Sequence, residues 1–144
     1  MRIVHTTQGD IMSTVELADE AATLEYGRQM AQSLSHGAVI ALQGELGAGK
    51  TTFTKGLAEG FGVHEVVTSP TFVLMKLYDT HGQSDITRLC HIDAYRLTSA
   101  HDLIMIGAEE YLTDTRTVTV IEWPERVEGI LPDNAIKIVF EEVD

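Results

Sequence analysis

The sequence predicts a three-layer α/β domain whose central sheet is mainly parallel and partly mixed. Three observations support this fold class. Short runs of apolar and β-branched residues alternate along the chain with segments of helical periodicity. A glycine-rich turn joins one apolar run directly to a helical segment. In the middle of the chain, two strand-like runs follow each other with no helix between them, which indicates an antiparallel portion.

Length and composition favour one domain over residues 1–144. No run approaches about 18 consecutive apolar residues, and the N-terminus lacks an apolar signal-peptide core, so no membrane association is expected. Cys90 is the only cysteine, which excludes an internal disulfide and fits a reducing compartment. The cytoplasm is therefore the expected location.

The first part of the chain is predicted to form two short strands, a helix, a buried strand and a second helix. Asp19 is a suitable N-cap for the first helix. Phe53, Leu57 and Phe61 share one face of the second helix. The predicted ranges are 2–7 and 12–17 for the strands, about 20–34 for the helix, 38–43 for the buried strand and about 49–61 for the second helix.

The second part is predicted to contain four strands and one interrupted helix. Gly107 interrupts the helical pattern, and Pro124 ends the alternating run before it. The predicted ranges are 72–78 and 87–92 for two strands, 100–112 for the helical segment, and 117–123 and 136–140 for the last two strands.

The glycine-rich turn matches the phosphate-binding pattern G-x-x-x-x-G-K-[ST] at every position, between a strand and a helix. Glycines allow the backbone N–H groups to wrap the phosphates, and the helix N-terminus adds unpaired donors. A lysine after the last glycine reaches the β- and γ-phosphates, and the hydroxyl that follows is the expected Mg²⁺ ligand. These residues predict a P-loop NTPase-like domain that binds a nucleoside triphosphate with Mg²⁺: Gly44, Glu45, Leu46, Gly47, Ala48, Gly49, Lys50 and Thr51.

Two acids that follow strand-like runs, Asp93 and Glu122, are the candidates to complete the site. One acid of such a pair helps to hold Mg²⁺, and the other can orient the attacking water. The residues alone leave open which acid does which. Asn134 is the only asparagine and does not lie in the Asn-Lys-x-Asp pattern by which GTPases read guanine, so ATP is the expected nucleotide.

The charge balance is strongly acidic. Twenty-two acids face ten bases, giving a formal net charge of −12, and the bases are spread along the chain. Nucleic acid is repelled by such a surface, so direct tRNA or DNA binding is not expected. An acidic face that docks on a basic partner remains an alternative to a simply acidic, soluble surface.

Together these motifs resemble the TsaE family of bacterial P-loop ATPases. The match spans most of the chain in the family's order, and its Glu-Trp-Pro and Asp-x-Tyr-Arg-Leu segments are more specific than the phosphate loop. The matching segments are 44–53, Ser69-Pro70-Thr71-Phe72, His91-Ile92-Asp93-Ala94-Tyr95-Arg96-Leu97, Ile121-Glu122-Trp123-Pro124-Glu125-Arg126, Leu131-Pro132 and Gly107.

The resemblance implies an ATPase subunit for N6-threonylcarbamoyladenosine formation at position 37 of tRNAs that read codons beginning with A. Such a subunit does not form that bond itself; it works with TsaD and TsaB and reaches tRNA only through the complex. By similarity, Lys50 is catalytic and binds phosphate, Thr51 and Glu122 serve Mg²⁺, and Asp93 is the Walker-B-like acid. Thr52 belongs to the nucleotide-binding segment, and Glu20 lies near the base pocket.

Some family members carry a Gly-Arg-containing tail after the last strand. The sequence departs from this pattern because it stops at Asp144, so a nucleotide contact from such a tail is not carried over. Hydrolysis by the chain alone is expected to be slow, because P-loop enzymes without a placed arginine are slow. Arg96 is the nearest such arginine by sequence.

Two other functions remain open at this point. A small-molecule kinase of similar size would need an arginine-bearing lid, for which Arg116 and Arg126 are too sparse. A non-enzymatic binding module would use ATP only to order a docking surface.

Overall fold

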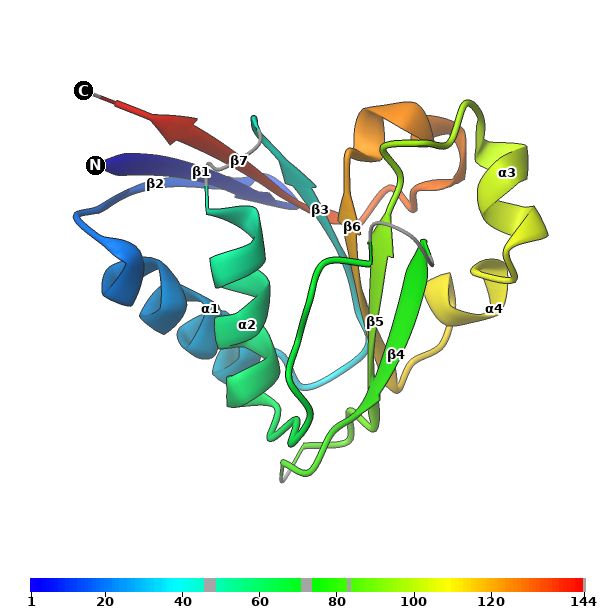
Figure 1. The fold of residues 1–144 in the computed structure, drawn as a ribbon, viewed down its shortest axis with the longest axis horizontal. Coiled ribbons are helices and arrows are strands. Elements are labelled where there is room, and N and C mark those ends of the chain that lie inside the picture. Colours follow the sequence, from blue (N-terminus) through cyan, green and yellow to red (C-terminus); the bar gives the residue numbers. More distant parts are fainter. Residues whose placement is uncertain (46–48, 71–73, 83, 144) are drawn as a thin grey trace.

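The computed structural model describes residues 1–45, 49–70, 74–82 and 84–143 (Figure 1). The elements, in chain order, are β1 (Arg2–Gln8), β2 (Ile11–Leu17), α1 (Glu20–Ser33), β3 (Ala38–Gln43), α2 (Lys50–Gly60), β4 (Met75–Asp79), β5 (Arg88–Asp93), α3 (Ala100–Met105), α4 (Glu109–Leu112), β6 (Thr117–Glu122), two 3-10 turns (Pro124–Arg126 and Glu128–Ile130) and β7 (Ile136–Glu142).

The strands form one seven-stranded sheet in the order β2-β1-β7-β3-β6-β5-β4. Strands β7, β3, β6 and β5 are parallel and occupy its centre. At one end β4 runs antiparallel to β5, and at the other β1 runs antiparallel to both β7 and β2. The predicted sheet, mainly parallel and partly mixed, is therefore confirmed.

Helices cover both faces of this sheet, as the prediction of three layers requires. Figure 1 shows α1 and α2 on one face, and α3 and α4 on the other. Each face has its own hydrophobic core, one containing Phe53 and Leu57 of α2 and the other containing Leu103 of α3. Strand β6 is buried along its whole length because both of its faces are covered.

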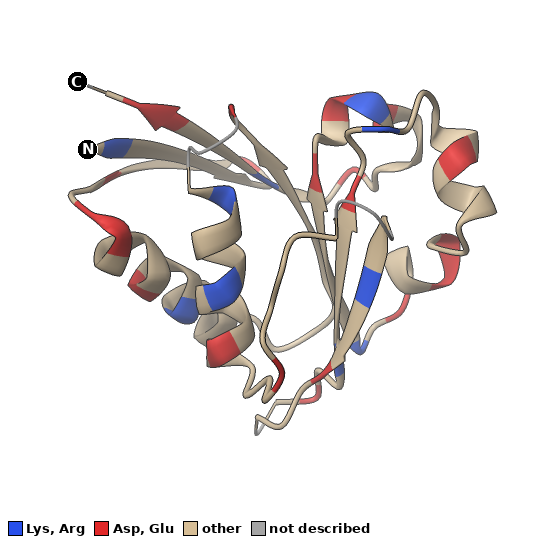
Figure 2. Cartoon of the chain, in the orientation of Figure 1, with Lys and Arg blue, Asp and Glu red and all other residues tan. Residues whose placement is uncertain are grey.

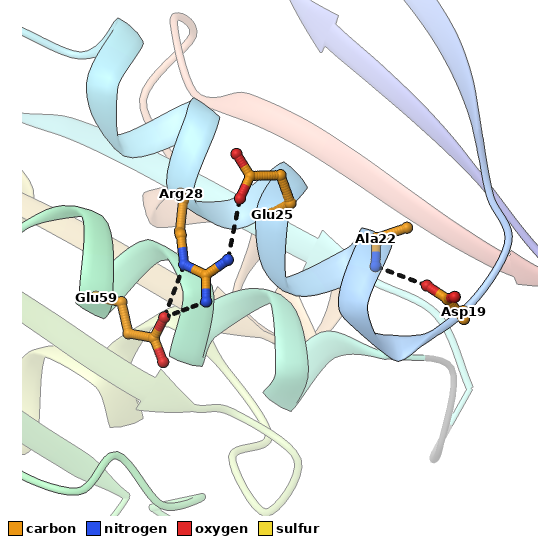
Figure 3. A network of polar contacts seen from close by, with 5 residues as sticks. All are labelled: Asp19, Ala22, Glu25, Arg28 and Glu59. Carbon is orange, nitrogen blue, oxygen red and sulfur yellow. Dashed lines mark hydrogen bonds and ion pairs between the residues drawn. The ribbon is translucent and has the colours of Figure 1, made fainter.

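Helices α1 and α2 approach each other closely at glycines. A Cβ atom added at Gly56 would lie 2.0 Å from the carbonyl oxygen of Leu24, so no larger residue fits there without moving a helix. On the outer side of the same contact, Arg28 of α1 donates to Glu25 at 3.0 Å and to Glu59 of α2 at 2.8 Å (Figure 3).

Most predicted boundaries agree with the structure to within one or two residues. The Asp19 carboxylate caps α1 by accepting from the Ala22 N–H at 2.8 Å (Figure 3). The segment 100–112 forms two helices, with Gly107 between them at a φ of 84°. Strand β6 ends at Glu122 rather than at Trp123, because Trp123 adopts a left-handed conformation with a φ of 59°.

The strand predicted from residue 72 begins at Met75 in the structure, and Phe72 lies outside the described residues. Within the described part of the chain, no helix is both long and apolar enough to cross a membrane.

Candidate functional site

The predicted phosphate loop leaves β3 and enters α2 at the end of the sheet where the parallel strands terminate. Gly44 and Gly49 have φ angles of 150° and 104°, values that favour glycine. A Cβ atom at Gly44 would also lie 2.9 Å from the carbonyl oxygen of Phe140 in β7. The structure therefore requires glycine at both described ends of the loop, while Leu46, Gly47 and Ala48 lie outside the described residues. Glu45, which follows Gly44, is exposed.

Lys50, the first residue of α2, places a buried amine at this edge. The residue is only 4% exposed, and its Nζ atom has no hydrogen-bond partner among the described residues. Burial lowers the pKa of Lys50, and the negative charges of Glu122, Glu125 and Asp93 oppose that effect. The amine also lies 4.2 Å from the centre of the Trp123 ring. A buried cation without a hydrogen-bond acceptor is suited to pairing with an anionic ligand.

The two predicted acids lie side by side on neighbouring parallel strands. Asp93 ends β5 and is paired in register with Glu122, which ends β6. Alternate residues of a strand share one face. Val118 and Val120, which share the face of Glu122, pack in the core beneath α1 and α2. Both carboxylates therefore emerge on the sheet face that carries the lysine of α2.

The two acids have different surroundings. Glu122 is 6% exposed, and its carboxylate lies 2.7 Å from Nε2 of His91, a fully buried histidine of β5. Asp93 is partly exposed and accepts a hydrogen bond from the Tyr95 N–H at 3.0 Å.

The hydroxyl-bearing residues after the lysine lie in the first turn of α2. Thr51 and Thr52 are both partly buried. The Thr52 hydroxyl is 3.5 Å from a carboxylate oxygen of Glu20, the first residue of α1. The structure thus brings the N-termini of α1 and α2 together. The predicted site residue Glu20 therefore lies beside the first turn of α2.

Three features of the site were not predicted from the sequence. The bond between His91 and Glu122 is one, and the contact of the Trp123 ring with Lys50 is another. The third is Arg2: a Cβ atom added at Gly49 would lie 2.9 Å from Nε of Arg2, which forms an ion pair with Glu142 at 3.3 Å. Arg2, which lies far from the loop in sequence, thus lies against Gly49 at the described end of the loop, whereas Arg96 is an exposed residue beyond β5.

The donor set of the site suits Mg²⁺ with nucleotide. Among the described residues, no group of three or more His, Cys, Asp or Glu side chains could hold a metal ion. Mg²⁺ in nucleotide sites needs no such group, because it binds through one or two protein oxygens together with phosphate oxygens and water. Thr51, Asp93 and Glu122 offer oxygens of this kind beside the phosphate loop.

Comparison with known proteins identifies relatives along most of the chain. The family model described as "Threonylcarbamoyl adenosine biosynthesis protein TsaE" matches residues 17–144. A protein of Treponema pallidum named "tRNA threonylcarbamoyladenosine biosynthesis protein TsaE" is 47% identical over 116 residues, which cover 81% of this chain and 82% of the relative. The protein of that name from Haemophilus influenzae is 34% identical over 136 residues, covering 91% and 83%.

A solved structure shows the same fold. The crystal structure of Bacillus subtilis YdiB superposes with a TM-score of 0.67 at 29% sequence identity. The superposition covers 96% of this chain and 76% of YdiB.

Proposed function

Because the chain belongs to the TsaE family, we propose that it binds and hydrolyses ATP in support of N6-threonylcarbamoyladenosine formation at position 37 of tRNA. The name shared by its relatives assigns the process: the chain acts in tRNA threonylcarbamoyladenosine biosynthesis. The finer parts of the proposal are the ATPase activity, Mg²⁺ as cofactor, and TsaD and TsaB as the partners through which the chain reaches tRNA.

The observation that carries the ATPase proposal is the buried amine of Lys50 beside two strand-end carboxylates. The amine has no hydrogen-bond acceptor among the described residues, and burial disfavours its charged form. The phosphates of a nucleotide held by the loop would supply oxygens to this ammonium. Binding would thus give an ammonium that lacks a hydrogen-bond acceptor a charge-assisted hydrogen bond, which is the stronger kind of hydrogen bond.

The protein residues divide the remaining work between them. The backbone N–H groups at the start of α2 favour negative charge at that point. The Thr51 hydroxyl and one of the two acids would hold Mg²⁺, which when bound neutralises charge on the β- and γ-phosphates. The other acid would accept a hydrogen bond from the attacking water and so orient it. Both assignments of Asp93 and Glu122 to these roles are consistent with their adjacent positions.

ATP is proposed over GTP because the Asn-Lys-x-Asp guanine reader is absent from the sequence. In the described part of the chain, Arg2 lies against Gly49 and forms an ion pair with Glu142 at 3.3 Å, rather than being an arginine dedicated to the phosphates by the sequence motif. Hydrolysis by the chain alone is therefore proposed to be slow, on the order of 10⁻³ s⁻¹ or less. Partner proteins would accelerate or exploit it.

The test compares Lys50→Ala with Lys55→Ala, which removes an exposed lysine from the same helix. We expect Lys50→Ala to weaken ATP binding about 10- to 150-fold, the loss that corresponds to roughly 1.5–3 kcal/mol for a hydrogen bond to a charged group. Lys55→Ala should bind ATP normally. Calorimetry gives the affinities, and threonylcarbamoylation of tRNA reconstituted with TsaD and TsaB gives the activity.

Near-normal ATP affinity of Lys50→Ala would contradict the proposed site. Normal ATP binding by the wild-type chain, with no hydrolysis in single-turnover reactions that contain all partners, would instead indicate a nucleotide-gated binding module.

A further inference from the structure

We propose that His91 is a positioning residue that fixes the Glu122 carboxylate in the orientation required for Mg²⁺-dependent nucleotide binding. The inference rests on the proposed function, since it assigns a role toward the nucleotide and its metal. It concerns a residue with no expected chemical role, which the structure nevertheless places in direct contact with a site acid. In this role Nε2 of His91 binds Oε2 of Glu122 and leaves Oε1 as the oxygen for a metal ion or a water molecule.

The first argument is the depth at which the contact lies. His91 is 0% exposed and Glu122 is 6% exposed, and the two atoms are 2.7 Å apart. This distance lies at the short, charge-assisted end of the range for a nitrogen and a carboxylate oxygen. A contact shielded from water in this way restricts the rotation of the carboxylate more than an exposed one does.

The second argument is that a histidine is a poor choice merely to fill this part of the core. Its other ring nitrogen, Nδ1, is buried and has no hydrogen-bond partner among the described residues. A buried polar atom without a partner destabilises the fold, and an apolar side chain such as leucine would avoid that cost. The position therefore carries a polar group at the expense of stability, which is expected where the group serves a site.

The third argument is the rigidity of the framework. His91 pairs in register with Val120, and Asp93 pairs with Glu122, two residues farther along the same parallel ladder. Since alternate residues share a face, the histidine lies one step behind both acids. One strand, β5, thus supplies one acid of the site and also holds the acid supplied by its neighbour.

His91 does not itself reach the nucleotide in this arrangement. Its ring is fully buried, and its Nε2 atom faces Glu122. It acts through the carboxylate, as residues behind a metal ligand commonly do, and loss of such a residue typically lowers metal affinity about 10- to 100-fold.

The experiment measures how much Mg²⁺ tightens ADP binding, as the ratio of dissociation constants in EDTA and in Mg²⁺, by calorimetry. We expect His91→Leu to reduce this ratio at least about tenfold while the EDTA affinity stays unchanged. His91→Gln should restore most of the ratio, because the longer glutamine side chain can still donate an amide N–H to Glu122. The control is Thr119→Val, which removes a fully buried hydroxyl from β6 away from the carboxylates and should leave the ratio unchanged.

Glu122→Gln distinguishes a failure of the positioning role of His91 from a failure of the metal role of Glu122. If Glu122→Gln lowers the ratio and His91→Leu does not, the positioning role is wrong and the proposed function stands. If neither variant changes the ratio, Glu122 does not serve Mg²⁺ and the inference is wrong, whereas the proposed function still stands with Asp93 as the acid that holds Mg²⁺ and Glu122 as the acid that orients water. In the Glu122→Gln background, His91→Leu should cause no further loss, and an independent loss would also overturn the inference.

Should His91→Leu fail to fold, His91→Asn takes its place, because its shorter amide does not reach Glu122. A ratio equal to that of His91→Gln would then contradict the proposal. Circular dichroism at the temperature of the titration establishes that each variant is folded.

Discussion

The Lys50 ammonium is a charge that the fold buries before any ligand compensates it. Burial lowers its pKa, and three nearby carboxylates only partly offset that effect. The Trp123 face, 4.2 Å from Nζ, offers a cation–π contact worth about 0.5–2 kcal/mol. A phosphate oxygen of the proposed nucleotide would offer the ammonium a charge-assisted hydrogen bond, typically worth about 1.5–3 kcal/mol, in place of this contact. A buried charge without a hydrogen-bond acceptor is one way in which a site can favour an anionic ligand.

Cys90, the only thiol of the chain, gives a prediction at the same scale. Burial raises the pKa of Cys90 to about 12, above its unfolded value of about 8.5. The folded state therefore retains the thiol proton to higher pH than the unfolded state. The contribution of this proton to stability is fully present below about pH 8.5 and falls by about 1.4 kcal/mol per unit as the pH rises toward 12.

We accordingly expect the folded chain not to react with a thiol-specific chromogenic reagent at pH 8, and one thiol to react after unfolding in urea. Absorbance of the released chromophore measures both. Rapid reaction of one thiol equivalent with the folded chain would show that Cys90 is neither buried nor protonated.

Individual residues differ in how far the sequence reveals them. The residues of the phosphate-loop pattern are contiguous, so their spacing alone is enough to predict a phosphate site. Asp93 and Glu122 were predictable because parallel strands end at one edge of a sheet. The bond between His91 and Glu122 was not, because it depends on strand register and on side-chain rotamers. Arg2 reaches Gly49 only because β1 pairs with β7, a contact between the two ends of the chain.

At the scale of elements, the contact of α1 with α2 supports the phosphate loop from behind. A Cβ atom at Gly27 would lie 2.3 Å from the carbonyl oxygen of Phe53, and one at Gly60 would lie 2.6 Å from the Ala31 side chain. Glycines on both helices thus permit a closer approach than side chains would allow. Since α2 begins at Lys50, a shift of this helix would also move the amine relative to the strand-end carboxylates.

Gly56→Ala tests this packing. Alanine favours a helix by about 1 kcal/mol over glycine, but its Cβ atom would lie 2.0 Å from the Leu24 carbonyl oxygen. We expect the clash to dominate and to lower the free energy of unfolding by about 1–3 kcal/mol. The matched control is Gly129→Ala, whose Cβ atom meets only the Ala100 side chain at 3.8 Å. Urea denaturation measures both, and equal stability of the two variants would refute the close-packing argument.

Element types and approximate bounds were largely predictable, because periodicity, glycines and prolines are local signals. The division of 100–112 at Gly107 is an example. The order of the strands in the sheet was harder to predict from the sequence. The N-terminal hairpin joins the sheet through β7, the last strand, and no local pattern specifies such a pairing. Trp123 was expected to extend β6, but its left-handed backbone turns the chain into the Pro124–Arg126 turn.

At the scale of the whole molecule, charge constrains the partners. Figure 2 shows acidic residues on both helical layers and at several strand ends, whereas lysines and arginines occupy separate short segments. The network around Arg28 illustrates the imbalance, since one guanidinium there is shared between Glu25 and Glu59. A chain with a net charge of −12 releases few phosphate counterions on contact with nucleic acid. A role in tRNA modification therefore favours access to tRNA through other proteins.

The last prediction concerns these proteins. We expect the chain to bind a TsaD–TsaB complex in an ATP-dependent manner and to bind free tRNA poorly. Acidic surfaces favour basic docking sites, and their attraction is screened as the Debye length shortens, so association should weaken as salt rises from about 50 to about 200 mM. The measurement is a binding titration at both salt concentrations with each ligand separately, in ATP, ADP and no nucleotide. Lys50→Ala should abolish the difference between nucleotide states without altering the salt dependence, whereas Lys55→Ala should preserve both. Tight binding of naked tRNA, with no binding to the protein complex in any nucleotide state, would overturn the expectation and reveal a basic surface that the net charge conceals.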